Sequence, residues 1–196
     1  MEFRDVVRQR RMRRRFEERP VPEEALARIV DAASRAPSAG FSQGQRLVVV
    51  TERASRQRLG ELCGEDAYDA WGAWVSTCGA QIVPCVSEEV YHRRYREADK
   101  TDESGTEIDW PVPYWWMDIG CTVENILLAA VDEGLGAGFA GTDRAGWTEI
   151  ESFLGIPAEY TPVGVIPVGY PLPDVKSPSL DRGKVPLTEF AHRERW

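Results

Sequence analysis

Arg8-Gln-Arg-Arg-Met-Arg-Arg-Arg-Phe16 places six arginines within nine residues of a 196-residue chain whose formal net charge is −8. The first twenty residues hold eight arginines against four acidic residues, a net charge of +4, so the remaining 176 residues carry −12. A run of like charge is typical either of a solvated surface or of a segment that binds an anion. The residues beside it favour the second interpretation.

Apolar residues precede the arginines at helical spacing. Phe3, Val6, Val7 and Arg10 fall on one stripe of a helix, and Arg14 lies one turn further along that stripe. A guanidinium that leaves water must be paired, and a phosphate accepts the two parallel hydrogen bonds that arginine donates. The stretch therefore predicts a helix that reaches Arg14 and a phosphorylated ligand beside it.

Length and composition fit a single domain over residues 1–196. Hydrophobic residues make up 42% of the chain and charged residues 29%, and no apolar run approaches the ~20 residues of a membrane-spanning helix. We expect a cytoplasmic protein, because its N-terminus lacks the apolar stretch of a secretory signal. We expect reduced thiols and no metal site, because the possible ligands are scattered: Cys63, Cys78, Cys85, Cys121, His92 and His192.

Hydrophobic periodicity and turn residues divide the chain into elements. Pro20-Val-Pro-Glu-Glu24 opens a helix, because proline suits the first turn and carboxylates suit the positive end of the helix dipole. A central helix is predicted from Met117 to Glu133, where apolar residues recur every three or four positions. The other predicted elements are a loop at 36–45, strands at 47–51, 80–86 and 160–170, helices at 54–63, 66–78 and 187–196, and a charged surface insertion between 88 and 110.

Two segments allow both a structural and a functional interpretation. Trp110-Pro-Val-Pro-Tyr-Trp-Trp116 is either core packing or a wall for a planar substrate, with Trp110, Tyr114 and Trp115 as the candidates. Gly134-Leu-Gly-Ala-Gly-Phe-Ala-Gly141 is either a helix cap with a turn or a backbone that a flat or phosphorylated ligand can approach, although it lacks the lysine and serine of a P-loop.

Several separated stretches together resemble the flavin-dependent nitroreductase family. Arg10-Arg-Met-Arg-Arg-Arg-Phe16, followed by Pro20-Val-Pro22, is similar to the family's opening Arg-Arg-Ser-x-Arg-x-Phe signature, and Ala36-Pro-Ser-Ala-Gly-Phe-Ser-Gln43 to its Ala-Pro-Ser-x-x-Asn-x-Gln loop. The remaining resemblances are Asp118-Ile-Gly120 with Glu124-Asn-Ile-Leu-Leu-Ala-Ala130, Gly134-Leu-Gly136, and Ile166-Pro-Val-Gly-Tyr-Pro171. These motifs follow the family order over nearly the whole chain, and only the part from Glu65 to Trp116 matches none.

The resemblance implies an α+β fold, with a mostly antiparallel sheet wrapped by helices, in a homodimer that exchanges its C-terminal segments. Exchange accounts for the apolar tail, in which Leu187, Phe190 and Trp196 need cover. By the same resemblance, FMN binds at the dimer interface. The residues that match its FMN-binding positions are Arg10, Arg11, Met12, Arg14, Pro37, Ser38, Ala39, Phe41, Gln43, Ala140, Gly141, Arg182 and Lys184.

Three of the matched positions depart from the family pattern. Met12 stands where a serine hydroxyl usually contacts the phosphate, and Phe41 replaces an asparagine in the flavin loop. Glu124 replaces a common glutamine and puts a carboxylate on the central helix. These departures fit a divergent substrate or weaker cofactor binding.

The function implied by the resemblance is FMN-dependent oxidoreduction. NAD(P)H would reduce the flavin, and a nitro-aromatic, quinone or flavin acceptor would then take the electrons in a ping-pong reaction without a protein acid or base. One alternative is a protein that binds or sequesters FMN without turnover. Nucleic-acid binding through the arginines is disfavoured by the −12 charge on the rest of the chain, and no membrane partner is expected.

Overall fold

The computed structural model describes residues 1–67, 72–101 and 103–196, and its centre is an antiparallel sheet. The sheet has the order β1-β2-β5-β3, and β4 also pairs with β2. Its longest pairing joins β1 and β2 in a register that sets Gln45 opposite Val86 and Val50 opposite Gln81. The strands are β1 (Gln45–Val50), β2 (Ala80–Val86), β3 (Gly136–Ala137), β4 (Thr161–Pro162) and β5 (Ile166–Gly169).

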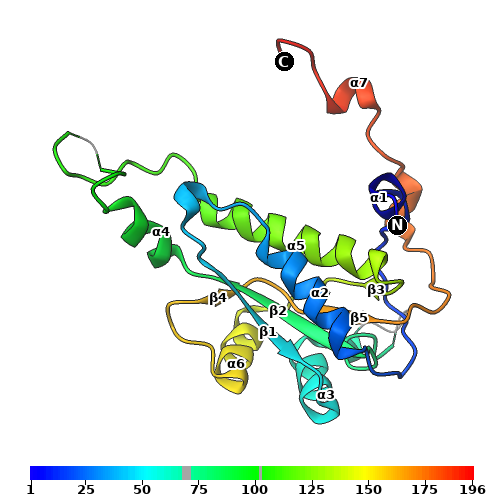
Figure 1. Ribbon diagram of the computed structural model, residues 1–196. Coiled ribbons are helices and arrows are strands. Elements are labelled where there is room, and N and C mark those ends of the chain that lie inside the picture. The colour runs from blue at the N-terminus through cyan, green and yellow to red at the C-terminus, as the bar shows by residue number, and fades with distance from the viewer. Residues whose placement is uncertain (68–71, 102) are drawn as a thin grey trace.

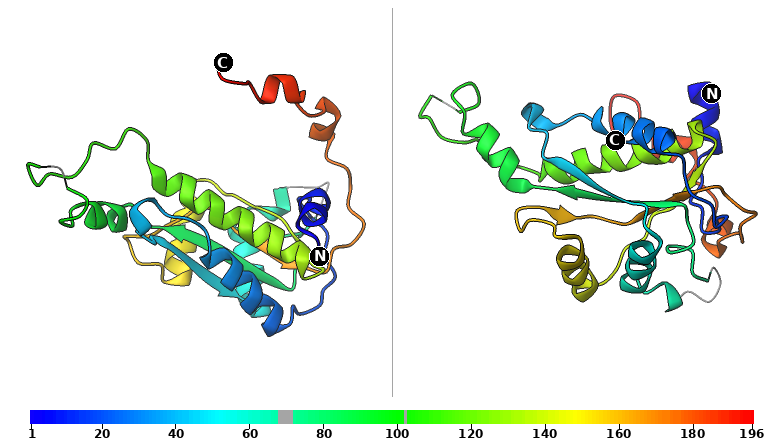
Figure 2. Two further views of the ribbon diagram at one scale, coloured as in Figure 1. Left: turned by 45° about the horizontal axis from the view of Figure 1, so that its top comes forward. Right: turned by 60° about the horizontal axis from the view of Figure 1, so that its bottom comes forward.

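Helices cover both faces of the sheet (Figure 1). The helices α2 (Glu23–Ser34) and α5 (Tyr114–Asp132) lie on one face, and α3 (Arg53–Leu62) and α6 (Arg144–Leu154) lie on the other, as both views of Figure 2 also show. Each layer buries its own apolar cluster, one centred on Ile29, Ile126 and Ile166, the other on Leu59, Val83 and Ile150. This arrangement confirms the predicted α+β fold with a mostly antiparallel sheet.

Short helices complete the chain and lie toward the ends of the molecule. They are α1 (Phe3–Gln9), α4 (Glu88–Tyr95), α7 (Leu187–Phe190) and the 3-10 turns η1 (Ala39–Phe41), η2 (Glu65–Ala67) and η3 (Pro178–Arg182). No helix among the described residues is both long and apolar enough to cross a membrane. Within the same residues, no three His, Cys, Asp or Glu side chains are grouped so that they could hold a metal ion.

The cysteines are free thiols, as expected for a reduced protein. Cys63, Cys78 and Cys85 are packed in the core, and burial raises the pKa of each thiol to about 12. These three side chains therefore stay protonated and serve as small apolar groups. Cys121 is exposed on α5.

The predicted N-terminal helix is too long by about one turn. Helix α1 ends at Gln9, and Phe3 and Val7 are exposed, so only Val6 of the expected stripe is buried. A longer helix would stack arginines three and four residues apart, and like charges at that spacing repel one another. The backbone from Arg10 to Phe16 is instead extended, and Met12 and Phe16 form β-bridges with Ala137 and Pro171.

Three other predicted elements also differ. The helix expected at 66–78 is wrong, since residues 72–78 form bends and turns; Trp71 lies outside the described residues. Glu65 explains the turn, because its carboxylate accepts the backbone N–H groups of Val75 and Ser76, both at 2.9 Å. The strand expected at 160–170 is divided into β4 and β5, and the last helix covers only Leu187–Phe190.

Candidate functional site

The extended segment from Arg10 to Phe16 is fixed between two other parts of the chain. Arg13 N donates to Ala137 O at 2.9 Å, and Leu172 N donates to Arg15 O at 3.0 Å. Gly138 permits this approach, because a Cβ there would lie 2.4 Å from Arg13 O. Two cavities border this segment, and Arg8, Arg11 and Arg13 line both of them.

The larger of the two is a strongly basic cavity of about 950 Å³, here called the basic cavity. Its wall on this segment consists of Arg8, Arg10, Arg11, Met12, Arg13 and Arg14, and Lys184 of the C-terminal segment reaches it from the other wall. Its lining residues do not include Arg182, which is exposed at the end of η3. The structure therefore brings together four of the predicted phosphate-side residues and one of the two predicted tail cations.

Asp174 is the acidic residue in the wall of the basic cavity, and its carboxylate is already engaged. It accepts the backbone N–H of Arg14 at 2.8 Å and that of Val175 at 2.8 Å. These hydrogen bonds therefore join the tail to the arginine segment. Outside this wall, Glu124 forms an ion pair with Arg10, with 3.4 Å between Oε1 and Nε. The carboxylate that departs from the family pattern thus helps to position an arginine of the basic cavity.

A smaller cavity of about 290 Å³, here called the indole cavity, also has Arg14 in its wall. It contains Trp74, Ala140 and Gly141, and the Arg14 guanidinium lies 5.7 Å from the Trp74 ring centroid. Trp74 is buried and its Nε1 has no hydrogen-bond partner. A buried N–H without an acceptor costs about 1–3 kcal/mol, so an acceptor atom of a ligand here would be stabilised. The helix predicted at 66–78 contained Trp74, but no functional role was predicted for this residue.

The predicted flavin loop lies in a different place, beside a third cavity of about 730 Å³ lined by Ala36, Phe41 and Gln43. Phe41 and Gln43 have φ of 55° and 54°, and residues other than glycine seldom adopt such values. Ser38 helps to hold the loop in this shape, because its Oγ accepts the backbone N–H of Gln43 at 2.9 Å. Strained backbone of this kind is common where a loop meets a ligand.

Asp118, at the first turns of α5, fixes the same loop to the core. Its Oδ2 accepts the backbone N–H of Ala39 at 2.8 Å and the hydroxyl of Tyr91 at 2.9 Å. Burial, followed by this hydrogen bond to Asp118, raises the pKa of Tyr91 far above its ordinary value, so the hydroxyl stays protonated and donates. The sequence assigned Asp118 no role; a carboxylate within an apolar helix face was the available signal.

The two groups of predicted residues lie at opposite ends of α5. Asp118 holds the loop near the first turns, whereas Val131 at the last turn belongs to the wall beside the arginine segment. Thirteen residues of helix at 1.5 Å each separate these positions by about 20 Å. Within one chain, therefore, the structure does not bring Pro37, Ser38, Ala39, Phe41 and Gln43 together with the basic cavity.

The predicted substrate wall is part of an aromatic cluster between α4 and the start of α5. The ring of Trp110 lies 4.5 Å from that of Tyr95 and 5.7 Å from that of Trp115, measured between centroids. Trp115 is buried, whereas Trp110 and Tyr114 are half-buried. Trp115 therefore serves mainly as a core packing residue, whereas the rings of Trp110 and Tyr114 remain partly accessible to a ligand.

His92 on α4 joins this cluster to the segment that follows it. Its Nδ1 contacts Glu107, which also accepts a 2.6 Å hydrogen bond from Trp110 Nε1. Partial burial opposes the charged imidazolium, but hydrogen bonds to Glu107 and Glu88 outweigh it and raise the pKa of His92. Burial also opposes the Glu107 carboxylate, and hydrogen bonds from Trp110 and His92 outweigh it and lower the pKa of Glu107.

The His92–Glu107 pair is expected to stabilise the protein most between about pH 4.5 and 6.5. The stability that His92 contributes is complete below the pKa of His92 in the unfolded chain and is lost as pH rises through its raised pKa in the folded protein. The stability that Glu107 contributes is complete above the pKa of Glu107 in the unfolded chain and is lost as pH falls through its lowered pKa in the folded protein. His92→Gln should therefore cost about 0.5–1 kcal/mol more at pH 5.5 than at pH 9 in urea unfolding. His192→Gln, at the exposed histidine of the tail, is the control, and an equal cost of His92→Gln at both pH values would contradict the assignment.

The fold places this chain among α+β proteins with an antiparallel sheet between two helical layers. Its candidate site is an extended arginine segment beside a basic cavity. The chain belongs to the nitroreductase family, whose family model matches residues 7–170. A Methanothermobacter thermautotrophicus protein named "Putative NADH dehydrogenase/NAD(P)H nitroreductase" is 30% identical over 175 residues, which cover 87% of this chain and 78% of that protein.

Solved structures show the same fold. A nitroreductase family protein from Clostridium novyi NT has a TM-score of 0.71 at 24% identity, covering 88% of this chain and 86% of that one. The NADPH:FMN oxidoreductase from Vibrio harveyi, complexed with NAD+, has a TM-score of 0.74 at 22% identity, covering 99% of this chain and 77% of that one. The family resemblance predicted from the motifs is confirmed.

Proposed function

We propose that this protein is an FMN-dependent oxidoreductase that uses NAD(P)H to reduce a small conjugated acceptor in a ping-pong reaction. The observation that carries the proposal is the junction of the two cavities at Arg14, with basic side chains on one side and an unpartnered indole N–H on the other. Support comes from family membership and from the names of the relatives, which include an NADPH-dependent oxidoreductase of Staphylococcus aureus.

The donors of these cavities fit FMN. Arg10, Arg11, Arg14 and Lys184 supply the positive charge that a phosphate requires, while Met12 offers no hydroxyl. Arg182 remains a second candidate cation, supplied by a tail that would shift on binding. In the indole cavity, Trp74 offers its free N–H to a ring carbonyl oxygen.

Backbone groups would meet the flavin ring as well. Ala140 N is occupied, since it donates to Val165 O at 2.8 Å, and so Gly141 is the better placed backbone donor. Pro37, Ser38 and Ala39 would lie against the ring, with Phe41 as a stacking surface and Gln43 as a polar contact. When bound, FMN supplies a carrier that accepts hydride from NAD(P)H and returns electrons to the acceptor.

We propose that these halves meet in a homodimer, where the loop of one copy faces the cavities of the other. The separation of about 20 Å along α5 supports this arrangement, because one chain alone keeps the halves apart. The tail supports it too: Leu187, Phe190 and Trp196 are 81%, 76% and 102% exposed, and the segment extends away from the sheet in Figure 1. We propose that this tail packs on the partner copy.

The acceptor would bind near the aromatic cluster, with Trp110 and Tyr114 presenting ring edges and Trp115 supporting them from the core. The protein's own contribution is position and charge: Arg14 places a cation at the junction, and Asp118 holds the loop. A charge-assisted hydrogen bond from Arg14 would favour a negatively charged form of the ring by roughly 1.5–3 kcal/mol.

An absorption spectrum of the purified protein, followed by anaerobic titration with NADH and with NADPH, tests the proposal. We expect a yellow protein whose visible band bleaches on titration and returns when an acceptor is added. A flavin that binds but does not bleach would favour the sequestering alternative. A colourless protein that cannot be reconstituted with FMN would rule out both.

A further inference from the structure

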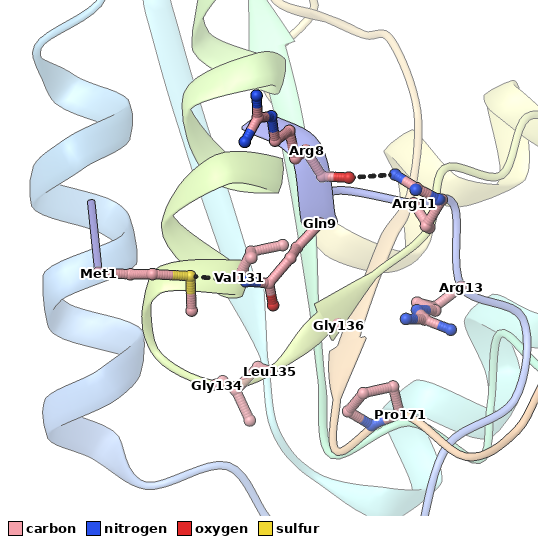
Figure 3. A pocket seen from close by; sticks show the side chains of 10 residues that line it. All are labelled: Met1, Arg8, Gln9, Arg11, Arg13, Val131, Gly134, Leu135, Gly136 and Pro171. Carbon is pink, nitrogen blue, oxygen red and sulfur yellow. Dashed lines mark hydrogen bonds between the residues drawn. The ribbon is translucent and has the colours of Figure 1, made fainter. Parts of the chain in front are cut away.

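A second cavity borders the arginine segment beside Gly136 and Pro171 and is here called the rear cavity (Figure 3); it shares Arg8, Arg11 and Arg13 with the basic cavity. Its volume is about 370 Å³. In Figure 3, Arg11 and Arg13 lie on one side of the rear cavity, Gln9 and Met1 lie toward the other, and Gly134–Gly136 passes below Gln9. Arg8 completes a set of three arginines, and no acidic residue lines this cavity.

Two carboxylates that adjoin these walls in sequence, Asp132 and Glu133, are already paired with other cations. Asp132 binds the N-terminal ammonium of Met1 at 2.6 Å. Glu133 binds the Arg28 guanidinium through two hydrogen bonds of 2.7 Å each. Among the residues that the structure describes, no carboxylate lies within ion-pair distance of Arg8, Arg11 or Arg13. In a chain of net charge −8, this is a local surplus of positive charge.

Two of the guanidinium groups are restrained before any ligand arrives. Arg11 Nη1 donates to Arg10 O at 2.8 Å and also to Arg8 O, so this side chain is held against its own backbone. The stem of Arg13 is half-buried on Gly136, where an added Cβ would lie 2.8 Å from Arg13 Cγ. The missing side chain at Gly136 therefore makes room for Arg13. Restrained donors lose less entropy when they bind an anion.

We propose that the rear cavity is a second anion site, which binds a phosphomonoester group beside Gly134–Gly136 while the phosphate of the proposed FMN occupies the basic cavity. Arginine fits this ligand because its planar fork donates two parallel hydrogen bonds to phosphate oxygens. The volume lies in the usual range for small-molecule sites and exceeds the need of one phosphate, so the group is carried by a larger molecule. The 2′-phosphate of NADPH and the phosphate of another small metabolite share this chemistry.

Calorimetric titration of the flavin-loaded protein with inorganic phosphate, against sodium chloride of equal ionic strength, tests the site. The wild type should bind phosphate saturably, and Arg13→Gln should raise its Kd about tenfold or more. Arg15→Gln, which removes an equal charge from the same segment but outside the rear cavity, should leave the Kd unchanged. Arg13→Lys keeps the charge and most of the stem over Gly136, and should raise the Kd by a smaller factor.

Titration with NADP+ and NAD+ distinguishes the sources. If the ligand is the 2′-phosphate of NADPH, NADP+ should bind more tightly than NAD+, and Arg13→Gln should abolish the difference. If another phosphomonoester is the ligand, the two dinucleotides should bind equally while the effect of Arg13→Gln on phosphate remains. Both results support the site.

Equal phosphate affinity of Arg13→Gln and wild type, or no saturable binding, would overturn the proposal. The proposal would also be overturned if Arg13→Gln dissociated the proposed homodimer and the wild type bound no phosphate. In that case the arginines would contact the partner chain instead of a ligand. Failure of the proposed function is a separate result. If the protein takes up no FMN, loss of phosphate binding in Arg13→Gln but not in Arg14→Gln still assigns the phosphate to the rear cavity, because Arg14 lines the basic cavity and not the rear one.

Discussion

Replacement of Arg14 by alanine is expected to raise the Kd of FMN by about tenfold to a hundredfold. A hydrogen bond from a charged group contributes roughly 1.5–3 kcal/mol, and each 1.4 kcal/mol is a factor of ten in affinity. Arg14 lines both the basic cavity and the indole cavity, so its loss affects the contacts on each side. Quenching of flavin fluorescence on titration gives the Kd, and stopped-flow reduction by NAD(P)H should slow as well.

Arg15→Ala is the matched control for this variant. Arg15 is exposed and donates to Pro173 O at 3.1 Å, so alanine there removes the same charge without touching either cavity. FMN binding to wild type should weaken only modestly with salt, because screening acts mainly on exposed charge and Arg14 is half-buried. An Arg14→Ala protein that retains its flavin and reduces at the normal rate would contradict the role given to Arg14.

The parts of the fold that follow from local pattern could be predicted. The central helix was predicted at 117–133 and spans Tyr114–Asp132, because its apolar residues recur at helical spacing through a buried face. Strand β2 was predicted at the observed residues, Ala80–Val86, and every one of them is buried. In both elements the residues that set the pattern are also the residues that are buried.

The arginine segment could not be predicted in the same way, because its conformation depends on distant partners. Repulsion between like charges disfavours a helix that continues to Arg14, but no local signal specifies the extended backbone that is observed. Hydrogen bonds to Ala137 and Leu172, more than a hundred residues away, decide the matter. The sequence pointed to an anion site through the number of arginines, but it did not reveal their arrangement in space. The extended backbone lies between two cavities, and Arg8, Arg11 and Arg13 line both of them.

The loop half of the candidate site shows a similar limit. The sequence located Ala36–Gln43 through its motif, but the residues that hold it, Asp118 and Tyr91, come from two other helices. Gly40 adds a third restraint, since a Cβ there would lie 2.6 Å from the Tyr95 ring. The loop therefore takes its shape from α4 and α5, and mutations that act on it can lie far from any cavity.

Asp118→Ala is accordingly expected to lower the free energy of unfolding by about 2–5 kcal/mol, the largest stability effect proposed for this protein. The change leaves the buried Tyr91 hydroxyl and the Ala39 N–H without their acceptor, and each orphaned donor costs about 1–3 kcal/mol. Urea unfolding measures the loss. FMN affinity should fall as well, because the loop loses its attachment to α5.

A double-mutant cycle with Tyr91→Phe separates this cause from simple loss of packing. Phenylalanine removes the hydroxyl and keeps the ring, so Asp118→Ala should cost about 1–2 kcal/mol less in the Tyr91→Phe background than in the wild type. Asp118→Asn, which keeps an accepting oxygen, should destabilise less than Asp118→Ala. If the cost of Asp118→Ala is the same in both backgrounds, the hydroxyl is not coupled to the carboxylate, and Asp118 does not join α4 to the loop.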